Sequence, residues 1–460
     1  MNIENAINQI ISEILKVISP PISNYGEIDT RQLIFNLASS TSWNNEDYLL
    51  IEFILKGLNI NNKLFLGYYK DGRKATDMFL CHKEWLELFF AILLKYTFLY
   101  DEKPSSSPLI AKINSVFKAL DLIQPDCLSK YPFLYNAIEQ KITSLYQSYP
   151  AYLKPSHDAI TYPIADITDK DIKTIPMIVL FYEGPIARAY LETMRSLGLK
   201  PKKIINLISS KDLISKKQIS SWLPTTFKKF FAYQVQKSKI HYWPRLLLKK
   251  HNKTVNALCL EIISTLFFEK NAIFNAYRCL PLSTYSDVID DLLIQDLSDP
   301  CLHDYLSDQP SCPILYTGGG IVPSSLLSIP NAHFIHIHPG FLPHIRGADC
   351  TLWSILLTGH ASATCFHMSP RIDEGNIIKA CWLPKLMLND KLNHLEVSIG
   401  YRLVYSFIDP WVRAFLLREL LKNQHNLAEL PTMTQIPEEG NTFHFMHHKM
   451  KKIIFETNYL

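Results

Sequence analysis

The first 150 residues place apolar side chains at helical spacing. In the opening segment IENAINQIISEILKVI, isoleucine and leucine recur every three or four positions, so they share one face of a helix. The segments NEDYLLIEFILKGL and SKYPFLYNAIEQKITSLYQ repeat this rhythm, and SPPISNYG and DEKPSSSPL separate them. Because proline, glycine and serine are typical of loops, the pattern predicts an all-helical N-terminal domain over residues 1–150.

The segment that follows, residues 151–174, loses the helical rhythm. It contains spaced prolines among polar residues, as in KPSHDAITYPIADITDK. Such a composition is typical of a linker, because it offers neither a continuous apolar face nor a run that could be buried. We therefore expect these residues to connect the helical domain to a second domain.

A different pattern begins near residue 175. IPMIVLFYEG is a continuous apolar run that ends in glycine, PIARAYLETMRSLG has helical spacing, and KKIINLIS is a second apolar run. A buried strand, a helix and another buried strand make a β-α-β unit, which predicts a parallel sheet. CPILYTGGG and AHFIHIHPG give two more strands, with the short helix PSSLLSI between them. We expect an α/β domain with an open, mostly parallel sheet over 175–385 and a helical and β extension over 386–460.

Charge changes this picture in one region. The 460 residues include 47 Lys+Arg against 43 Asp+Glu, a net charge of +4 that indicates no nucleic-acid partner by itself. Between Lys200 and Lys253, however, Asp212 is the single acid, and aromatic residues alternate with lysines. This stretch would suit a nucleic acid or an anionic carrier. We favour an amphipathic helical insertion, about 210–255, whose lysines lie along apolar surface.

Cysteine usage and the apolar runs indicate a cytoplasmic protein. The nine cysteines are scattered and include no Cys-x-x-Cys pair, which is typical of reduced thiols rather than of a disulfide framework or a structural zinc site. The N-terminus carries Glu4 and Glu13 where a signal peptide would carry lysine or arginine. The most apolar run, WLELFFAILLKYTFLY, is interrupted by Glu87 and Lys95, so we expect no membrane association.

Candidate binding and catalytic residues follow the predicted strands, because ligands bind beyond the carboxyl ends of strands in an open parallel sheet. After ILYT comes a glycine-rich loop, whose backbone can closely approach a flat ligand, although a triple glycine is at least as often only a mobile turn. The strand FIHIH ends in two histidines, His336 and His338, which share one face of the strand. A carboxylate pair follows ATCFHMS on a turn. In order, these residues are Gly318, Gly319, Gly320, Ile321 and Val322; His336 and His338; and Ile372, Asp373, Glu374 and Gly375.

Three interpretations of these residues remain open on the residue pattern alone. Imidazole and carboxylate groups at a sheet edge can carry out acid–base chemistry. Histidine and carboxylate are also common ligands of zinc and iron. Alternatively, the histidines are core residues that hydrogen-bond to strand carbonyls. The metal interpretation would use His333, His336, His338, His344 and Asp373.

The order of these segments resembles the formyltransferase family that uses 10-formyltetrahydrofolate. That family has the pattern Asn-x-His-Pro-Ser-Leu-Leu-Pro, a nearby Arg-Gly, a tryptophan-containing helix, a glycine turn and then Asp-x-Gly. The stretch FIHIHPGFLPHIRGADCTLWSILLTGHASATCFHMSPRIDEGNII follows it in register, and ILYTGGGIVPSSLLSIP is similar to the family's pteridine-contacting loop. The resemblance covers about 175–385. Matching residues are His338-Pro339, Leu342-Pro343, Arg346-Gly347, Trp353, Gly359, Asp373 and Gly375.

The resemblance implies transfer of a formyl group from 10-formyltetrahydrofolate, as co-substrate, to a small-molecule amine, with no metal. It implies that His336 and His338 donate hydrogen bonds to the oxyanion, while Asp373 orients the imidazoles and relays a proton. The two loops would hold the pteridine through residues 318–322 and through Ile372, Glu374 and Gly375. The acceptor would contact Arg346 and the helix start at Gly184 and Arg188, where a phosphate or carboxylate suits the helix N-terminus.

Two residues depart from the family pattern. His336 replaces the asparagine and Gly340 replaces the serine after His-Pro. A neutral imidazole can still donate one N–H, as the amide would, provided that a neighbour sets its tautomer. The alternatives are a folate-binding pseudoenzyme or scaffold protein, whose work lies in the helical half and the basic insertion, and then a metal-dependent hydrolase.

Overall fold

The computed structural model describes 3–17, 30–40, 83–99, 114–118, 172–219, 224–436 and 439–456, together with isolated positions between 43 and 51 and between 111 and 140. The chain divides into two compact units, one of Met1–Tyr149 with His444–Met450 and one of Pro150–Phe443 with Lys451–Leu460. The predicted linker over 151–174 lies outside the described residues apart from its last three. Ser220–Leu223 in the basic stretch lie outside them as well.

The described part of the first unit is mostly helical. Its helices are α1 (Ile3–Leu15), α2 (Thr30–Ser39) and α5 (Lys83–Leu99). Ile7, Ile11 and Ile14 are buried, so the face that the sequence pattern predicts for α1 is the packed face. His447 stacks on Phe117 within this unit, with ring centroids 5.1 Å apart. Residues 444–450 therefore pack with the N-terminal half, although the pattern alone placed them in the C-terminal extension. Among the described helices, none is long and apolar enough to cross a membrane.

The second unit is built on a seven-stranded sheet in the order β3-β2-β1-β4-β5-β7-β8. The first five strands are parallel, whereas β7 and β8 are antiparallel to their neighbours. This confirms the predicted open, mostly parallel α/β sheet. The strands are β1 (Lys173–Tyr182), β2 (Leu199–Ser209), β3 (Ile289–Ile294), β4 (Cys312–Tyr316), β5 (Ala332–His338), β7 (Ser362–His367) and β8 (Ile377–Trp382), and a separate pair is β6 (Ile345–Gly347) with β9 (Asn441–Phe443).

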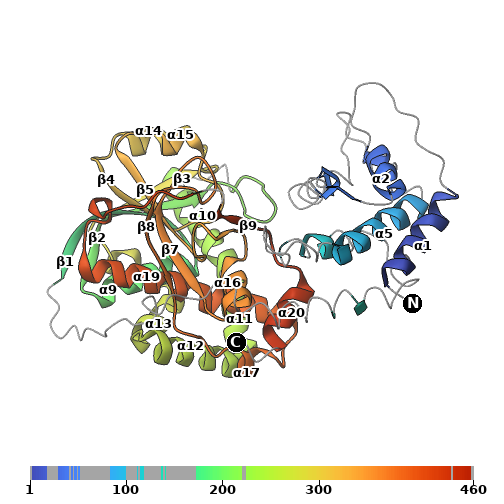
Figure 1. The fold of residues 1–460 in the computed structure, drawn as a ribbon. Coiled ribbons are helices and arrows are strands. Elements are labelled where there is room, and N and C mark those ends of the chain that lie inside the picture. The colour runs from blue at the N-terminus through green and yellow to red at the C-terminus, as the bar shows by residue number, and fades with distance from the viewer. Residues whose placement is uncertain are drawn as a thin grey trace. The chain divides into compact units, whose positions relative to one another are not determined.

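Helices cover both faces of this sheet. α14 (Pro300–Ser307) and α15 (Ser324–Leu327) lie above it in Figure 1, and Leu302, Leu306 and Leu326 pack there on Leu180. α9 (Pro185–Ser196) and α19 (Asp409–Asn423) lie against each other on the opposite face. Further helices in the second half of the chain are α16 (Cys350–Thr358), α17 (Asn389–Leu392), α18 (Val397–Leu403) and α20 (His448–Glu456), and a π-helical turn, η4 (Val404–Ile408), precedes α19.

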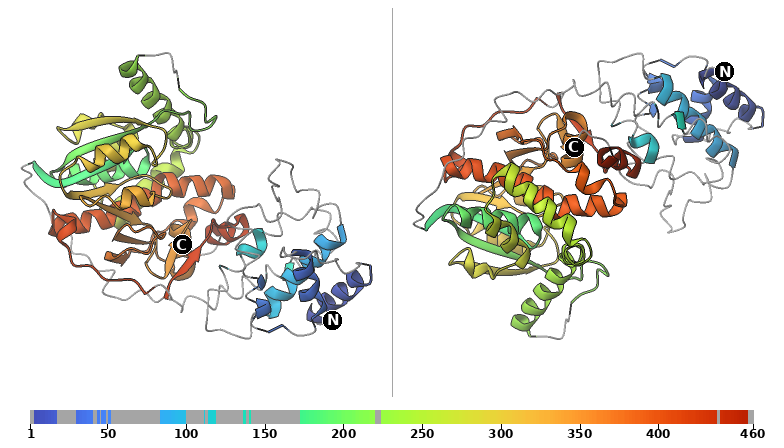
Figure 2. Two further views of the ribbon diagram at one scale, coloured as in Figure 1. Left: turned by 90° about the horizontal axis from the view of Figure 1, so that it is seen from above. Right: turned by 90° about the horizontal axis from the view of Figure 1, so that it is seen from below.

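The basic stretch forms helices between β2 and β3. These are α10 (Thr225–Ile240), α11 (Tyr242–Lys250), α12 (Asn252–Leu266) and α13 (Lys270–Arg278). Figure 2 shows α10 extending away from the sheet. Its inner face carries the buried Ala232 and Gln236, while Phe227 and Phe230 are exposed. The Gln236 side chain accepts from the Ser209 N–H and donates to the Leu207 carbonyl, so α10 is attached to the end of β2.

Candidate active site

His336 and His338 lie at the carboxyl end of β5, on the same face of the strand. They alternate with the buried Ile335 and Ile337, as the period of two requires. Nδ1 of His336 is 3.2 Å from the Tyr316 carbonyl oxygen at the end of β4. A carbonyl oxygen only accepts, so Nδ1 carries the hydrogen, and the neutral ring presents an unshared electron pair at Nε2. The neighbouring strand thus sets the tautomer of His336.

His338 connects three segments of the chain. Its Nε2 is 3.1 Å from the Ile345 carbonyl oxygen, which accepts a hydrogen bond from it. Its Nδ1 is 3.5 Å from Oδ2 of Asp373, and the same carboxylate oxygen accepts from the Gly347 N–H at 3.1 Å. Both nitrogens of His338 therefore face acceptors, so the ring is arranged to stabilise a proton shared with Asp373.

Both imidazoles are neutral at pH 7 because the site is buried. Burial and the positive charge of Arg413 together lower the pKa of His336 to about 4, against the opposing effect of the negative charge of Asp373. Burial also lowers the pKa of His338, in spite of Asp373. In the neutral state the N–H of each ring is already donated to a backbone carbonyl. The sequence pattern led us to expect that these histidines donate hydrogen bonds to the oxyanion. Their contacts with backbone carbonyls do not favour that role.

Sequence analysis missed a buried ion pair beneath these rings. Arg413 on α19 donates from Nη1 to the Ile337 carbonyl at 2.9 Å and from Nε to Asp409 at 3.0 Å. Asp409 also accepts from the Thr351 hydroxyl at 2.5 Å. The pair places a positive charge close to His336 and His338. Its sequence signal is two opposite charges four residues apart in the apolar stretch FIDPWVRAFLL, where unpaired charges would not be buried.

The two predicted pteridine loops present backbone and apolar surface. A Cβ atom added at Gly319 or Gly320 would meet no atom within 4 Å, so the backbone there is accessible. Ile321 is 70% exposed and Ile372 is 56% exposed, although large apolar side chains are usually buried. Val322 differs from this pattern, because its side chain is buried in the core beneath the loop. An aromatic ring system would fit two such loops through backbone polar groups and apolar contact.

Two contacts fix the loop after β7, an ion pair of Glu374 and the close packing of Gly375. Glu374 forms an ion pair with Arg346, with Nη1 and Oε1 2.9 Å apart. A Cβ atom at Gly375 would collide with the His367 carbonyl oxygen, which explains physically why glycine follows Asp-x here. The arrangement favours a positioning role for Arg346 and Glu374, since their charged groups contact each other rather than open space.

Arg188 lies in a buried network beyond the end of β1. Its Nε and Nη2 donate to the two carboxylate oxygens of Glu183 at 2.8 and 2.6 Å, and its Nη1 donates to the Leu280 carbonyl. The Tyr233 hydroxyl and His241 Nε2 contact the same carboxylate. Burial by itself would raise the pKa of Glu183, but the hydrogen bonds from Arg188 and His241 lower it far below its usual range. The guanidinium group of Arg188 therefore binds Glu183 and the Leu280 carbonyl, and these contacts do not support the expected contact with an acceptor anion.

Two histidines of the metal interpretation, His333 and His344, have partners other than His336, His338 and Asp373. His333 contacts the Ser311 hydroxyl, and Nδ1 of His344 is 3.2 Å from the Glu439 carbonyl oxygen. Among the described residues, one group brings three possible ligand atoms within 4.8 Å of one another, and it consists of Glu183, His241 and Cys279. Since Arg188 donates to both oxygens of Glu183, that group is an ion-pair network rather than a metal site.

Gly340→Ser, which restores the family's serine, is expected to destabilise the protein by about 1–3 kcal/mol. A Cβ at this position would collide with the Ile345 carbonyl oxygen and lie 2.7 Å from Nε2 of His338. Urea unfolding measures the effect. Gly319→Ser is the matched control, because its Cβ would meet open space. Wild-type stability of Gly340→Ser would show that the backbone around Ile345 can move.

Parts of this chain are similar to known proteins. No protein-family model matches the chain. Over 126 residues it is 29% identical to a methionyl-tRNA formyltransferase of Ehrlichia canis, and the match takes in 27% of this chain and 38% of that enzyme. The chain thus spans less than half the length of this relative. The chain is related to the formyltransferase family.

Solved structures of formyltransferases are also similar to this chain. A sugar N-formyltransferase from a Shewanella species is 14% identical, with a TM-score of 0.30 over 58% of this chain and 75% of that chain. An N-formyltransferase from Helicobacter canadensis, in complex with folinic acid and dTDP-3-aminofucose, is 12% identical, with a TM-score of 0.31 over 61% and 80%. The fold described above follows from the strand order of the sheet rather than from these scores.

Proposed function

We propose that this protein transfers a formyl group from 10-formyltetrahydrofolate to an amine. The observation that carries the proposal is the pairing of His338 with Asp373, 3.5 Å apart, at the carboxyl end of β5 and beside His336. An imidazole and a carboxylate in this arrangement can take up and return a proton. The exposed glycine loop after β4 supplies accessible backbone for a folate ring next to them.

The residue contacts support a proton-accepting role for the histidines. Transfer requires a bond from the acceptor nitrogen to the formyl carbon and loss of a proton from that nitrogen. Nε2 of His336 has the unshared pair that can accept this proton, because Nδ1 donates to Tyr316. The bond from the formyl carbon to the folate nitrogen then breaks, and that nitrogen takes up the same proton, which the pair of His338 and Asp373 relays from His336, so that each group returns to its starting state. The charge of Arg413 beneath the rings stabilises the negative oxygen of the intermediate.

The test is a transfer assay with the full-length protein. A carbon-labelled formyl donor is incubated with a panel of sugar amines, amino acids and an aminoacylated tRNA, and mass spectrometry follows the labelled product. Release of tetrahydrofolate with equal formation of an N-formyl product supports the proposal. If folinic acid binds and no amine in the panel is formylated, the transferase proposal fails.

One observation favours a second candidate function, a folate-binding protein without transfer. Both neutral imidazoles have given their N–H groups to backbone carbonyls, those of Tyr316 and Ile345. Neither ring then has an N–H for the formyl oxygen, which the asparagine of the family would provide. The same transfer assay, read beside folate binding by calorimetry, separates the two functions.

His336→Asn is expected to lower the rate of transfer by about 10²-fold, because an amide cannot act as a base. The pKa of His336 near 4 means that its basic form is present at neutral pH and is lost as the pH falls through about 4. The wild-type rate should therefore fall in that range, and the profile of the variant should lack this step.

Circular dichroism at each pH shows whether the protein stays folded, and His333→Asn, an exposed histidine on the same strand, is the control. An equal or faster rate for His336→Asn would mean that the imidazole merely replaces the family's amide donor.

A further inference from the structure

Three phenylalanines on α10 face away from the protein core. Phe227 is 68% exposed, Phe230 is 67% exposed and Phe231 is 45% exposed. Their spacing of three and four residues places them side by side along one face of the helix, and we call them the phenylalanine stripe. Single apolar residues on a surface are ordinary, but a contiguous group of large ones indicates an interaction surface.

The phenylalanine stripe does not attach α10 to the rest of the second unit. The helix is attached through another face, where Ala232 packs with Ile208 and Gln236 is hydrogen-bonded to the end of β2. At about 100° per residue, that face lies roughly opposite the stripe. Figure 2 shows α10 extending away from the sheet. The stripe therefore faces outward from a helix that projects from the domain.

Positive charge flanks the phenylalanine stripe on both sides. Helical spacing places Lys228 and Lys239 along one flank and Lys237 along the other. The sequence of α10, TTFKKFFAYQVQKSKI, contains neither aspartate nor glutamate. Nζ of Lys237 donates to the Cys279 carbonyl at 3.2 Å, and a carbonyl does not neutralise its charge. The charges of α10 therefore favour an anionic partner. They oppose the pairing of two copies of this chain stripe to stripe, which would bring lysines against lysines.

Apolar rings between lysines suit the surface of an anionic lipid membrane. A helix of this kind lies in the plane of the membrane, with its apolar face at the boundary of headgroups and acyl chains. Anionic headgroups attract each lysine that reaches the surface. Single-stranded nucleic acid also binds to aromatic and basic residues, but in a groove that follows the strand. Because the stripe runs along a projecting helix, the geometry favours a flat lipid surface.

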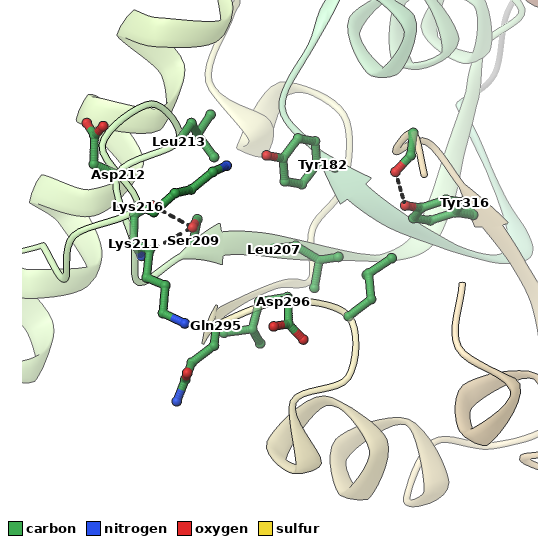
Figure 3. Close-up of a pocket in the computed structure, with 13 residues that line it drawn as sticks. Tyr182, Leu207, Ser209, Lys211, Asp212, Leu213, Lys216, Gln295, Asp296 and Tyr316 are labelled. Atoms are coloured by element: carbon green, nitrogen blue, oxygen red, sulfur yellow. Dashed lines mark hydrogen bonds between the residues drawn. The ribbon is translucent and has the colours of Figure 1, made fainter. Parts of the chain in front are cut away.

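The pocket at the carboxyl ends of β1 to β4 is separate from the phenylalanine stripe. It has a volume of about 510 Å³ and is drawn in Figure 3. Its described lining residues, such as Tyr182 and Tyr316, come from these strands and the loops after them, and they include none of α10. Figure 3 shows Lys216 extending toward Tyr182, so this lysine faces the pocket. Changes in the stripe should therefore leave small-molecule binding unaffected.

We propose that the phenylalanine stripe docks this protein on an anionic lipid membrane, with α10 lying in the plane of the headgroups. The inference does not depend on the proposed formyl transfer. It replaces the expectation of no membrane association, which followed from the lack of an apolar run long enough to span a bilayer. None of the described helices could span a membrane, but a helix that lies in the surface requires only an apolar face.

Co-sedimentation of the full-length protein with vesicles tests this docking. One set of vesicles is pure phosphatidylcholine, and the other also contains phosphatidylserine. We expect binding to the anionic vesicles only. Phe227→Gln/Phe230→Gln should weaken it at least about tenfold, because two aromatic rings no longer enter the lipid. Lys228→Gln/Lys239→Gln should weaken it at least about fivefold, and added salt should act in the same direction.

Two substitutions outside α10 are the matched controls. Leu260→Gln removes an exposed apolar side chain from α12, and Lys270→Gln removes an exposed lysine from α13. Both should bind the anionic vesicles as the wild type does. Thermal melting shows whether each variant is folded. If Phe227→Gln/Phe230→Gln and Leu260→Gln bind equally well, the phenylalanine stripe is not the docking surface and the inference is overturned.

The other outcomes separate membrane docking from its competitors and from the proposed function. If the wild type binds folinic acid but no anionic vesicle, docking is overturned while formyl transfer stands. If vesicles bind through the stripe and no formyl group moves, docking stands and the transferase proposal fails. Without vesicle binding, a stripe-dependent complex with a single-stranded oligonucleotide would overturn docking in favour of a nucleic acid. A stripe-dependent dimer in analytical ultracentrifugation would do so in favour of a second copy.

Discussion

His338→Ala is expected to lower the turnover number by about 10²- to 10³-fold while leaving folate affinity nearly unchanged. The imidazole acts on a proton and a charge that appear only in the transition state, so its loss affects the rate rather than ground-state binding. It is the residue through which Ile345, Asp373 and the end of β5 are joined. Steady-state kinetics and calorimetry with folinic acid measure the two quantities separately.

Asp373→Asn provides the second half of this experiment. The amide keeps the size of the side chain and removes the charge that supports a protonated His338. If the two residues act as a unit, the double variant should be hardly slower than the slower single variant, because residues that share one task are strongly non-additive. His333→Ala, on the same strand but exposed, is the matched control. Independent, multiplicative losses would show that Asp373 and His338 do not share a proton.

Much of the fold could be predicted because its central strands are buried on both faces. The continuous apolar runs at β1, β2, β4 and β5 have no other stable place in a protein of this size. β3 was missed because Asp290 and Asp291 interrupt its run. At the edge of the sheet these two carboxylates are satisfied by Lys203 and Asn206 of β2, and such pairing leaves no trace in hydrophobic periodicity.

In the candidate site, the sequence predicts only those features that depend on residues close together in the chain. A period of two places His336 and His338 on one face, and this follows from any strand. The tautomers do not follow, because they depend on the carbonyls of Tyr316 and Ile345, which neighbouring segments bring to the rings. Arg413 likewise reaches β5 from 76 residues away in the chain. Sequence spacing carries no information about such contacts.

Glu183→Gln is expected to lower the free energy of unfolding of the second unit by about 3–5 kcal/mol, the usual cost of leaving a buried charge without its partner. Glu183 and Arg188 are both buried, and the carboxylate also receives the Tyr233 hydroxyl and His241. Removing the negative charge leaves the guanidinium uncompensated in an apolar setting. Urea unfolding followed by tryptophan fluorescence and by circular dichroism measures the loss.

Two further variants decide whether Arg188 has this structural role or binds the acceptor. Arg188→Met alone should be destabilising, because it leaves Glu183 buried without its main donor. Glu183→Leu/Arg188→Met removes both charges, and its stability should recover toward that of the wild type, since a buried ion pair exchanged for apolar groups costs little. If Arg188 instead bound an acceptor anion, Arg188→Lys would raise KM in the transfer assay and leave unfolding unchanged. In the structural role, the Glu183 carboxylate joins α9 to α10 and to the start of α11. Arg188→Lys would then clearly lower the stability and leave KM unchanged.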